Sequence, residues 1–176
     1  MILVVQPIGE RSAMNIYLKD VSERDLSLLF EFQNDPIANN MADVPARERA
    51  AFYQHWRQNI FANDQAIAIG IWHDNILVGH LVSWINDELA TENEPEVRLI
   101  GYWIGRKYWG KGIATQALNL FLQQYITSPV YAYIDLQNQG SLKVAQANGF
   151  VDVTAQYSSL FTKDNLLIFK RDNVTS

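Results

Sequence analysis

A glycine-rich segment between two apolar stretches is the feature that most constrains the fold of this chain. Residues 100–104 have the composition of a strand, and the apolar side chains that follow Ala114 recur at helical spacing. Gly105, Gly110 and Gly112 lie between the two stretches. A glycine-rich turn at a helix N-terminus leaves backbone N–H groups unpaired at the positive end of the helix dipole, so an anion is its natural ligand. The segment therefore predicts a strand, a pyrophosphate-binding loop and a helix.

The composition restricts the class of protein. A chain of 176 residues that is 48% hydrophobic predicts one folded domain. The absence of cysteine excludes disulfides and thiol nucleophiles, and His55, His73 and His80 do not have the spacing of metal ligands. The net charge of −5 argues against nucleic-acid and acidic-membrane partners. No apolar run approaches the roughly 20 residues of a membrane-spanning helix, so we expect a cytoplasmic protein. From the spacing of the histidines we expect that it binds no metal.

Apolar periodicity and turn residues predict an α+β fold. We expect a short N-terminal extension over residues 1–13 and a single domain over residues 14–176. Ser22 and Asp25 predict the start of a first helix, and Pro45 predicts the first turn of a second helix. Both signals come before the glycine-rich segment, and the sequence as a whole contains no internal repeat. One α+β domain is therefore the simplest prediction.

The remaining elements do not follow a repeated strand–helix–strand order, which favours a largely antiparallel sheet. Asp74 and Asn75 predict a hairpin turn, and Gly149 predicts the end of a short helix. The expected strands are residues 15–18, 66–72, 76–85, 97–104, 130–136, 151–161 and 166–170, and the expected helices are residues 23–33, 45–60, 114–122 and 141–148.

Other functions of the glycine-rich segment are open at this point. Residues 105–112 nearly match the nucleotide-binding pattern G-x-x-x-x-G-K-[ST], but Gly112 replaces the Ser or Thr that binds Mg²⁺. No G-x-G-x-x-G dinucleotide fingerprint is present. Glycines at a helix start are also typical of tight packing without any ligand. The nucleotide patterns are therefore incomplete, whereas packing alone remains an alternative.

Two segments of the chain resemble the cofactor-binding segments of the GNAT N-acetyltransferases. Residues 101–104 and 108–115 are similar to the family's acetyl-CoA loop, written [QR]-x-x-G-x-[GA], although Trp109 stands at the Gln or Arg position. Residues 138–141 and 147–150 resemble the family's second cofactor segment, in the same order. The branch that the chain resembles most is the one named for ribosomal-protein N-terminal acetyltransferases.

The resemblance implies a fold as well as a cofactor. The order of elements over residues 14–170 is similar to that of the family. The implied fold is a mixed, mostly antiparallel sheet of six to seven strands with about four flanking helices. In such a fold the parallel strands over residues 97–104 and 130–136 would splay apart, and acetyl-CoA would enter the gap.

The resemblance also implies which residues contact acetyl-CoA. Backbone N–H groups of the loop would hold the pyrophosphate, and the edge of the preceding strand would hold the pantetheine arm. The implied cofactor residues are Tyr102, Trp103, Ile104, Trp109, Gly110, Lys111, Gly112, Ile113, Ala114, Thr115, Asn138 and Ser141. Asn138 and Ser141 are equally typical of a turn and a helix cap.

Acetyl transfer from a thioester to an amine requires a neutral amine, a polarised carbonyl and a stabilised thiolate. The resemblance implies direct attack in a ternary complex. In the branch named above, the position of Leu99 usually holds a catalytic Glu, and many members have a Tyr at the position of Ala145. Glu96 is the candidate base that remains, and its alternative is a solvated carboxylate paired with Arg98.

Strand tyrosines and a histidine are further candidates for catalysis. Tyr102, on the strand that precedes the loop, is a candidate to protonate the thiolate, as are Tyr133 and Tyr157, and core packing is the alternative for each. His80 lies in the run over residues 76–85, where it would orient substrate or relay a proton. The alternative for His80 is a hydrogen-bonded histidine within the sheet.

The resemblance leaves the acceptor open. It implies an amine, either a small molecule or a protein N-terminus, and a monomer or homodimer. We expect residues 35–46 and 87–96 to form the acceptor site. Because Leu99 and Ala145 replace the family's usual catalytic residues, a CoA-binding module without transferase activity is the second hypothesis.

Overall fold

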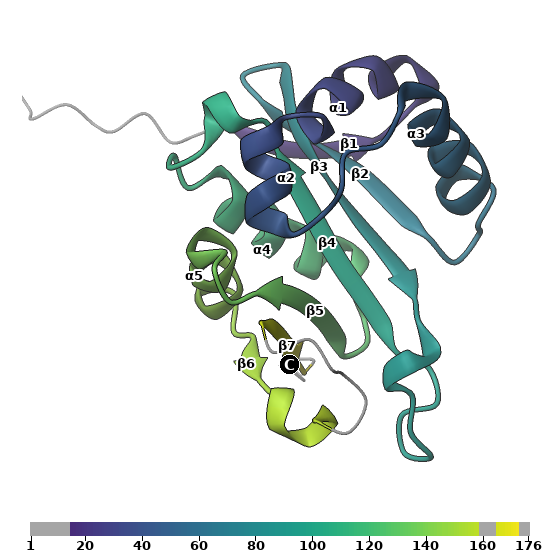
Figure 1. The fold of residues 1–176 in the computed structure, drawn as a ribbon, viewed down its shortest axis with the longest axis vertical. Coiled ribbons are helices and arrows are strands. Elements are labelled where there is room, and N and C mark those ends of the chain that lie inside the picture. Colours follow the sequence, from purple (N-terminus) through teal and green to yellow (C-terminus); the bar gives the residue numbers. More distant parts are fainter. Residues whose placement is uncertain (1–14, 159–164, 173–176) are drawn as a thin grey trace, which may run out of the picture.

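The computed structural model describes residues 15–158 and 165–172, and their centre is a seven-stranded sheet (Figure 1). The strands are β1 (Ile16–Asp20), β2 (Ile67–His73), β3 (Ile76–Ile85), β4 (Arg98–Ile104), β5 (Val130–Asp135), β6 (Val151–Asp152) and β7 (Leu166–Arg171). Their order in the sheet is β1-β2-β3-β4-β5-β7-β6. All neighbours pair antiparallel except β4 and β5, which are parallel. The mixed, mostly antiparallel α+β fold is therefore confirmed.

Within the described residues, five α-helices and several short helical turns connect the strands. The α-helices are α1 (Leu26–Gln33), α2 (Pro36–Ala42), α3 (Arg49–His55), α4 (Ile113–Tyr125) and α5 (Gln139–Ala147). A π-helical stretch over Trp56–Phe61 continues α3. Turns of 3₁₀-helix cover Glu23–Asp25, Asp87–Leu89, Arg106–Tyr108 and Thr154–Tyr157. None of the helices in the described part has the length and hydropathy that a bilayer crossing needs.

Apolar side chains are buried on both faces of the sheet. The helices α4 and α5 pack with residues of β1 to β5 into the larger core, around Phe121. The helices α1 and α3 pack on the opposite face around Phe52 and Trp56, which are each 1% exposed. A third cluster lies around Leu99 and Tyr131, where β4 meets β5. The sheet is therefore fixed from both sides, and the ends of its strands hold their positions.

The parallel strands β4 and β5 separate soon after they begin. They pair only at Arg98 with Val130 and at Leu99 with Tyr131. Beyond Leu99, β4 continues to Ile104 beside β3, but its other edge has no pairing with β5. The splay implied by the family resemblance is thus present, and it opens toward the glycine-rich segment.

Several local predictions are confirmed. Ser22 and Asp25 form a capping box, in which Asp25 Oδ2 accepts from Ser22 N at 2.8 Å and from Ser22 Oγ at 2.7 Å. Asp74 and Asn75 form the hairpin turn with φ values of 49° and 64°. Gly149 ends α5 with a φ of 80°.

Other local predictions are wrong. The helix α2 was not predicted; its N-cap is Asp35, whose carboxylate accepts from Ile37 N and Ala38 N. Pro45 lies before α3 instead of in its first turn. The expected strand over residues 151–161 stops at Asp152, whose Oδ1 accepts from Thr154 N at 2.9 Å and turns the backbone into a 3₁₀-helix. The proposed extension over residues 1–13 lies outside the described residues.

Candidate functional site

The glycine-rich loop presents the start of α4 without a side-chain cap. Gly110 and Gly112 have φ values of 71° and 77°, a backbone conformation that favours glycine. Gly112 is the N-cap of α4, and no side chain accepts from the first turn of this 13-residue helix. Its first N–H groups also have no acceptor within the helix. The loop is therefore available to an anion in the way that its sequence predicts.

A cavity of about 350 Å³ lies between this loop, the free edge of β4 and the start of α5. We call it the loop cavity. Of the cofactor residues expected from the sequence, all except Lys111 line it, namely Tyr102, Trp103, Ile104, Trp109, Gly110, Gly112, Ile113, Ala114, Thr115, Asn138 and Ser141. Lys111 is exposed, and its ammonium lies 5.7 Å from the centre of the Tyr108 ring. The fold thus brings the two sequence segments to one cavity.

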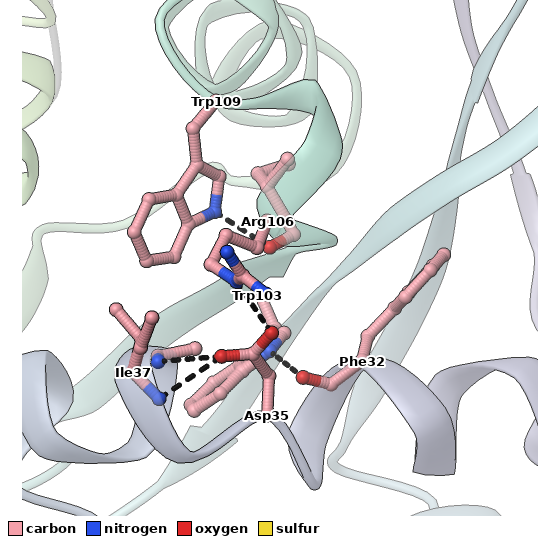
Figure 2. A network of polar contacts seen from close by, with 8 residues as sticks. Phe32, Asp35, Ile37, Trp103, Arg106 and Trp109 are labelled. Carbon is pink, nitrogen blue, oxygen red and sulfur yellow. Dashed lines mark hydrogen bonds and ion pairs between the residues drawn. The ribbon is translucent and has the colours of Figure 1, made fainter.

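A polar network holds the loop against the helices α1 and α2 (Figure 2). Arg106 Nε donates to Asp35 Oδ2 at 2.6 Å, and Trp103 Nε1 donates to the Phe32 carbonyl at 2.8 Å. Trp109 Nε1 donates to the Ile104 carbonyl at 2.8 Å, while the indole, 37% exposed, also lines the loop cavity. The ion pair with Arg106 is the main cause that lowers the pKa of Asp35. Arg106 is thus committed to this network.

A second cavity of about 670 Å³ lies on the other side of Tyr102, and we call it the large cavity. It is bounded by β3, β4, β5 and α5, and by the segment from α2 to α3. Residues that line both cavities are Ala42, Tyr102, Trp103, Asn138 and Ser141. The two cavities therefore adjoin where β4 and β5 separate.

Tyr102 occupies the junction of the two cavities. Its hydroxyl lies 2.9 Å from Ser141 Oγ, in the first turn of α5. Burial raises the pKa of Tyr102, and the hydrogen bond with Ser141 only partly opposes this effect. The phenol therefore keeps its proton at neutral pH and is able to act as a proton donor. Asn138 both caps α5, by accepting from Ser141 N at 3.0 Å, and lines the cavities.

His80 lines the large cavity from the centre of the sheet, where it pairs with Gly70 and Trp103. The side chain is 3% exposed, and its ring packs edge-on against Trp56 at 5.1 Å. Burial lowers the pKa of His80 to about 3, so its imidazole is neutral at neutral pH. His80 Nδ1 has no hydrogen-bond partner among the described residues. These properties suit a neutral hydrogen-bonding group better than a relay that takes up and releases protons.

Glu96 lies on an exposed turn before β4 and lines neither cavity. Arg98 does not pair with it, since the guanidinium donates to the Gln65 carbonyl and to Ser83 Oγ, each at 3.1 Å. The acidic connection over residues 87–96 also contributes no residue to the large cavity. Its Glu94 instead contacts the Tyr131 hydroxyl and lies 2.5 Å from Lys170 Nζ. Residues 87–96 therefore do not line the large cavity, because Glu94 ties this segment to β5 and β7.

The sequence analysis missed several polar residues of the large cavity. Asp135, at the end of β5, is the one carboxylate among its described lining residues. Arg47 and His55 line the cavity from the segment that contains α3. Burial and, to a smaller degree, the charge of Arg47 lower the pKa of His55. No local pattern marks these residues, because elements far apart in sequence bring them together.

Comparison with known proteins agrees with this geometry. A family model described as an acetyltransferase (GNAT) domain matches residues 15–151. No curated protein matches the chain. Because the family model covers most of the chain, it identifies the family, and the solved structures below test the fold.

Three solved structures illustrate the similarity of fold. A domain from Methanocaldococcus jannaschii is 19% identical, with a TM-score of 0.71 over 91% of this chain and 99% of that chain. The aminoglycoside acetyltransferase AAC(6')-Ib in complex with coenzyme A is 17% identical, with a TM-score of 0.69 over 90% of this chain and 95% of that chain. The spermidine N-acetyltransferase of Vibrio cholerae in complex with CoA and spermine is 14% identical, with a TM-score of 0.69 over 89% and 95%. With its glycine loop, its splayed strands and the match over residues 15–151, the chain belongs to the GNAT family of acetyltransferases.

Proposed function

We propose that this protein transfers the acetyl group of acetyl-CoA to a primary amine by direct attack in a ternary complex. The observation that carries the proposal is the meeting of two cavities at Tyr102, one at an uncapped helix start and one large enough for an organic amine. Solved relatives of the same fold contain CoA, ribostamycin or spermine. Acetyl-CoA would occupy the loop cavity and the amine the large cavity.

The loop cavity suits the phosphate and pantetheine parts of acetyl-CoA. Backbone N–H groups between Gly110 and Thr115 would hold the pyrophosphate, since the helix start has no side-chain cap. The free edge of β4 would pair with the amides of the pantetheine arm, because Tyr102, Trp103 and Ile104 have no partner strand on that side. Asn138 and Ser141 would contact the thiol end. Lys111, although exposed, would add positive charge near the phosphates.

Acetyl-CoA supplies a thioester, whose carbonyl carbon is the electrophile. The amine nitrogen forms a bond to that carbon as the carbon–sulfur bond breaks, and the products are an N-acetyl amine and free CoA. We propose that the Tyr102 hydroxyl, at the junction of the cavities, protonates the departing thiolate. The neutral amine loses one proton in the reaction, and water would carry this proton to the Tyr102 phenolate, which restores the phenol. His80 would hold the substrate through its neutral ring.

Neither candidate carboxylate is well placed to accept the proton of the amine, and this raises a second candidate function. The Asp135 carboxylate is already bonded, to Gln137 N at 2.8 Å and to Asn165 Nδ2 at 2.5 Å. Glu96 remains a candidate base only if the turn that carries it moves. A protein that binds CoA and transfers nothing, such as a sensor, would show the same loop cavity. A location in the cytoplasm, a monomeric or homodimeric state and the ribosomal-protein branch also remain predictions.

Release of free CoA thiol from acetyl-CoA, measured with a panel of primary amines, tests the proposal. We expect thiol release that depends on the amine and an acetylated product that accounts for the thiol in equal amount. Tyr102→Phe removes the proposed acid and should release thiol much more slowly with the same amine. Acetyl-CoA binding without thiol release across the panel would favour the non-catalytic candidate.

A further inference from the structure

The composition of the large cavity restricts the amine that it accepts. Among its described lining residues, Asp135 is the one carboxylate, and both of its oxygens accept hydrogen bonds from the protein. A buried ammonium group is costly unless a carboxylate or several acceptors pair with it. A molecule with several ammonium groups would need several such partners. The cavity is therefore poorly suited to a polycationic amine.

Arg47 gives the cavity a positive charge of its own. It is exposed, it lines the large cavity, and no described residue forms an ion pair with it. His55 lies nearby, with a lowered pKa that keeps it neutral. A guanidinium without a carboxylate partner attracts an anionic group and repels further cations.

The rest of the wall is uncharged and rich in aromatic side chains. Residues with Trp, Tyr or Phe rings that line the large cavity are Trp56, Trp84, Tyr102, Trp103, Tyr133 and Phe150. The indole Nε1 of Trp56 and the imidazole Nδ1 of His80 are buried and have no hydrogen-bond partner among the described residues. Such a wall favours a flat apolar body that also carries neutral hydrogen-bonding groups.

Among the described residues that line the cavity, no carboxylate other than Asp135 is available to take a proton from the amine. An ammonium group with the pKa of a lysine, about 10.4, is almost wholly charged at neutral pH. An α-amine, with a pKa of about 7.7–8.0 in a peptide, supplies a useful neutral fraction without a strong base. The chemistry of the wall therefore favours an α-amine over the terminal amines of a polyamine.

We propose that the acceptor is a small aromatic α-amine with a single ammonium group and one anionic group that binds Arg47. This inference rests on the proposed function, since it assigns the acceptor of the same site. It separates this chain from an enzyme whose acceptor is a polyamine.

Calorimetric titration of amines into the protein saturated with free CoA tests the inference without depending on turnover. The probes are phenylalanine, the dipeptide phenylalanyl-phenylalanine, the amides of both, and spermidine. Replacement of Arg47 by Gln removes the proposed anion partner. Replacement of Arg24, an exposed arginine that lines neither cavity, by Gln is the matched control. Asn63→Asp adds a carboxylate to the wall and keeps an oxygen that accepts from Gln65 N.

We expect at least one of the two acids to bind about tenfold more tightly than its amide and than spermidine. Arg47→Gln should remove the preference for the acid, and Arg24→Gln should keep it. Asn63→Asp should strengthen spermidine binding by about fivefold to tenfold. Tighter binding of spermidine than of both acids, equal binding of each acid and its amide, or no binding of any aromatic probe would overturn the inference.

The proposed function fails in a different way. If CoA itself does not bind, the loop-cavity assignment is wrong, and the same amine titrations are then read on the free protein. If CoA and the aromatic acids bind but no acetyl group is transferred, the acceptor preference stands and the catalytic assignment fails.

Discussion

Replacement of Tyr102 by Phe removes the phenolic hydroxyl that lies at the junction of the two cavities. In the structure its bond to Ser141 Oγ, 2.9 Å long, is the hydrogen bond that would be lost. Loss of one such bond costs about 1 kcal/mol of folding free energy, so the variant remains folded. Loss of a general acid lowers kcat by about 10²–10⁴-fold, equivalent to about 3–5 kcal/mol of barrier height. The increase in barrier height should therefore be much larger than the loss of folding free energy.

Steady-state kinetics with acetyl-CoA and an accepted amine, monitored as thiol release, measures this effect. We expect kcat to fall, while the KM for acetyl-CoA changes little, because the backbone of β4 and the loop are unaltered. Ser141→Ala separates loss of the hydrogen bond from loss of the acid, since it removes the same bond and keeps the phenol. Because Ser141 also lines the loop cavity, we expect the KM for acetyl-CoA to rise in this variant. Its kcat should stay within about fivefold of the unmodified protein.

The pH dependence gives a second readout of the same group. Burial raises the pKa of Tyr102, and the protonated phenol is the active form. The rate that depends on Tyr102 should therefore persist through neutral pH and fall only above about pH 10, the ordinary value for tyrosine. Tyr102→Phe should lack this alkaline loss. If the kcat of the Tyr102→Phe variant lies within about threefold of that of the unmodified protein, the role of Tyr102 as the acid is refuted.

Three further predictions concern the framework of the site. Burial holds the pKa of His80 at about 3, against 6.5 in the unfolded chain. Between these pH values the unfolded state therefore binds one proton more than the folded state. Stability should fall as the pH drops below 6.5, by up to about 1.4 kcal/mol per pH unit, and urea unfolding of His80→Gln should lack this contribution. Gly79→Ala should lower the melting temperature by several degrees or prevent folding, since a Cβ there would lie 2.2 Å from the Trp103 carbonyl oxygen. A melting temperature equal to that of the unmodified protein would contradict this. Asp35→Ala should lower the melting temperature more than Asp35→Asn, because asparagine still caps α2 although it loses the charge pair with Arg106. Equal melting temperatures for these two variants would show that the cap contributes little.

The parts of the site that were predictable from sequence are those that lie within continuous segments. The strand, the glycine loop and the start of α4 follow each other directly, so spacing and glycine positions were sufficient to place them. The short helix α2 was missed because Asp35-Pro36 ends one helix and also begins the next, with Asp35 as N-cap and Pro36 at the first position. Sequence signals for stopping and starting a helix coincide there.

The large cavity could not be predicted in the same way. Its charged residues, Arg47 and Asp135, come from the segment before α3 and from the end of β5, which are far apart in the chain. Their proximity depends on how β4 and β5 separate and on how α3 packs against the sheet. Glu96 was selected as the candidate base because Leu99 stands at the family's usual Glu position, and the structure places Glu96 on an exposed turn. The position of Glu96 along the chain did not show whether its side chain reaches the cavity.

Calorimetric titration of acetyl-CoA into the purified protein tests whether the loop cavity binds this co-substrate. Gly112→Asp places a carboxylate where the pyrophosphate is expected, and Gly149→Asp is the matched control. Both glycines have left-handed backbones, with φ values of 77° and 80°, but only Gly112 lines the loop cavity. We predict micromolar binding by the unmodified protein and by Gly149→Asp, and its loss in Gly112→Asp with the fold retained. Absence of binding by the unmodified protein, or equal binding by all three, would contradict the account.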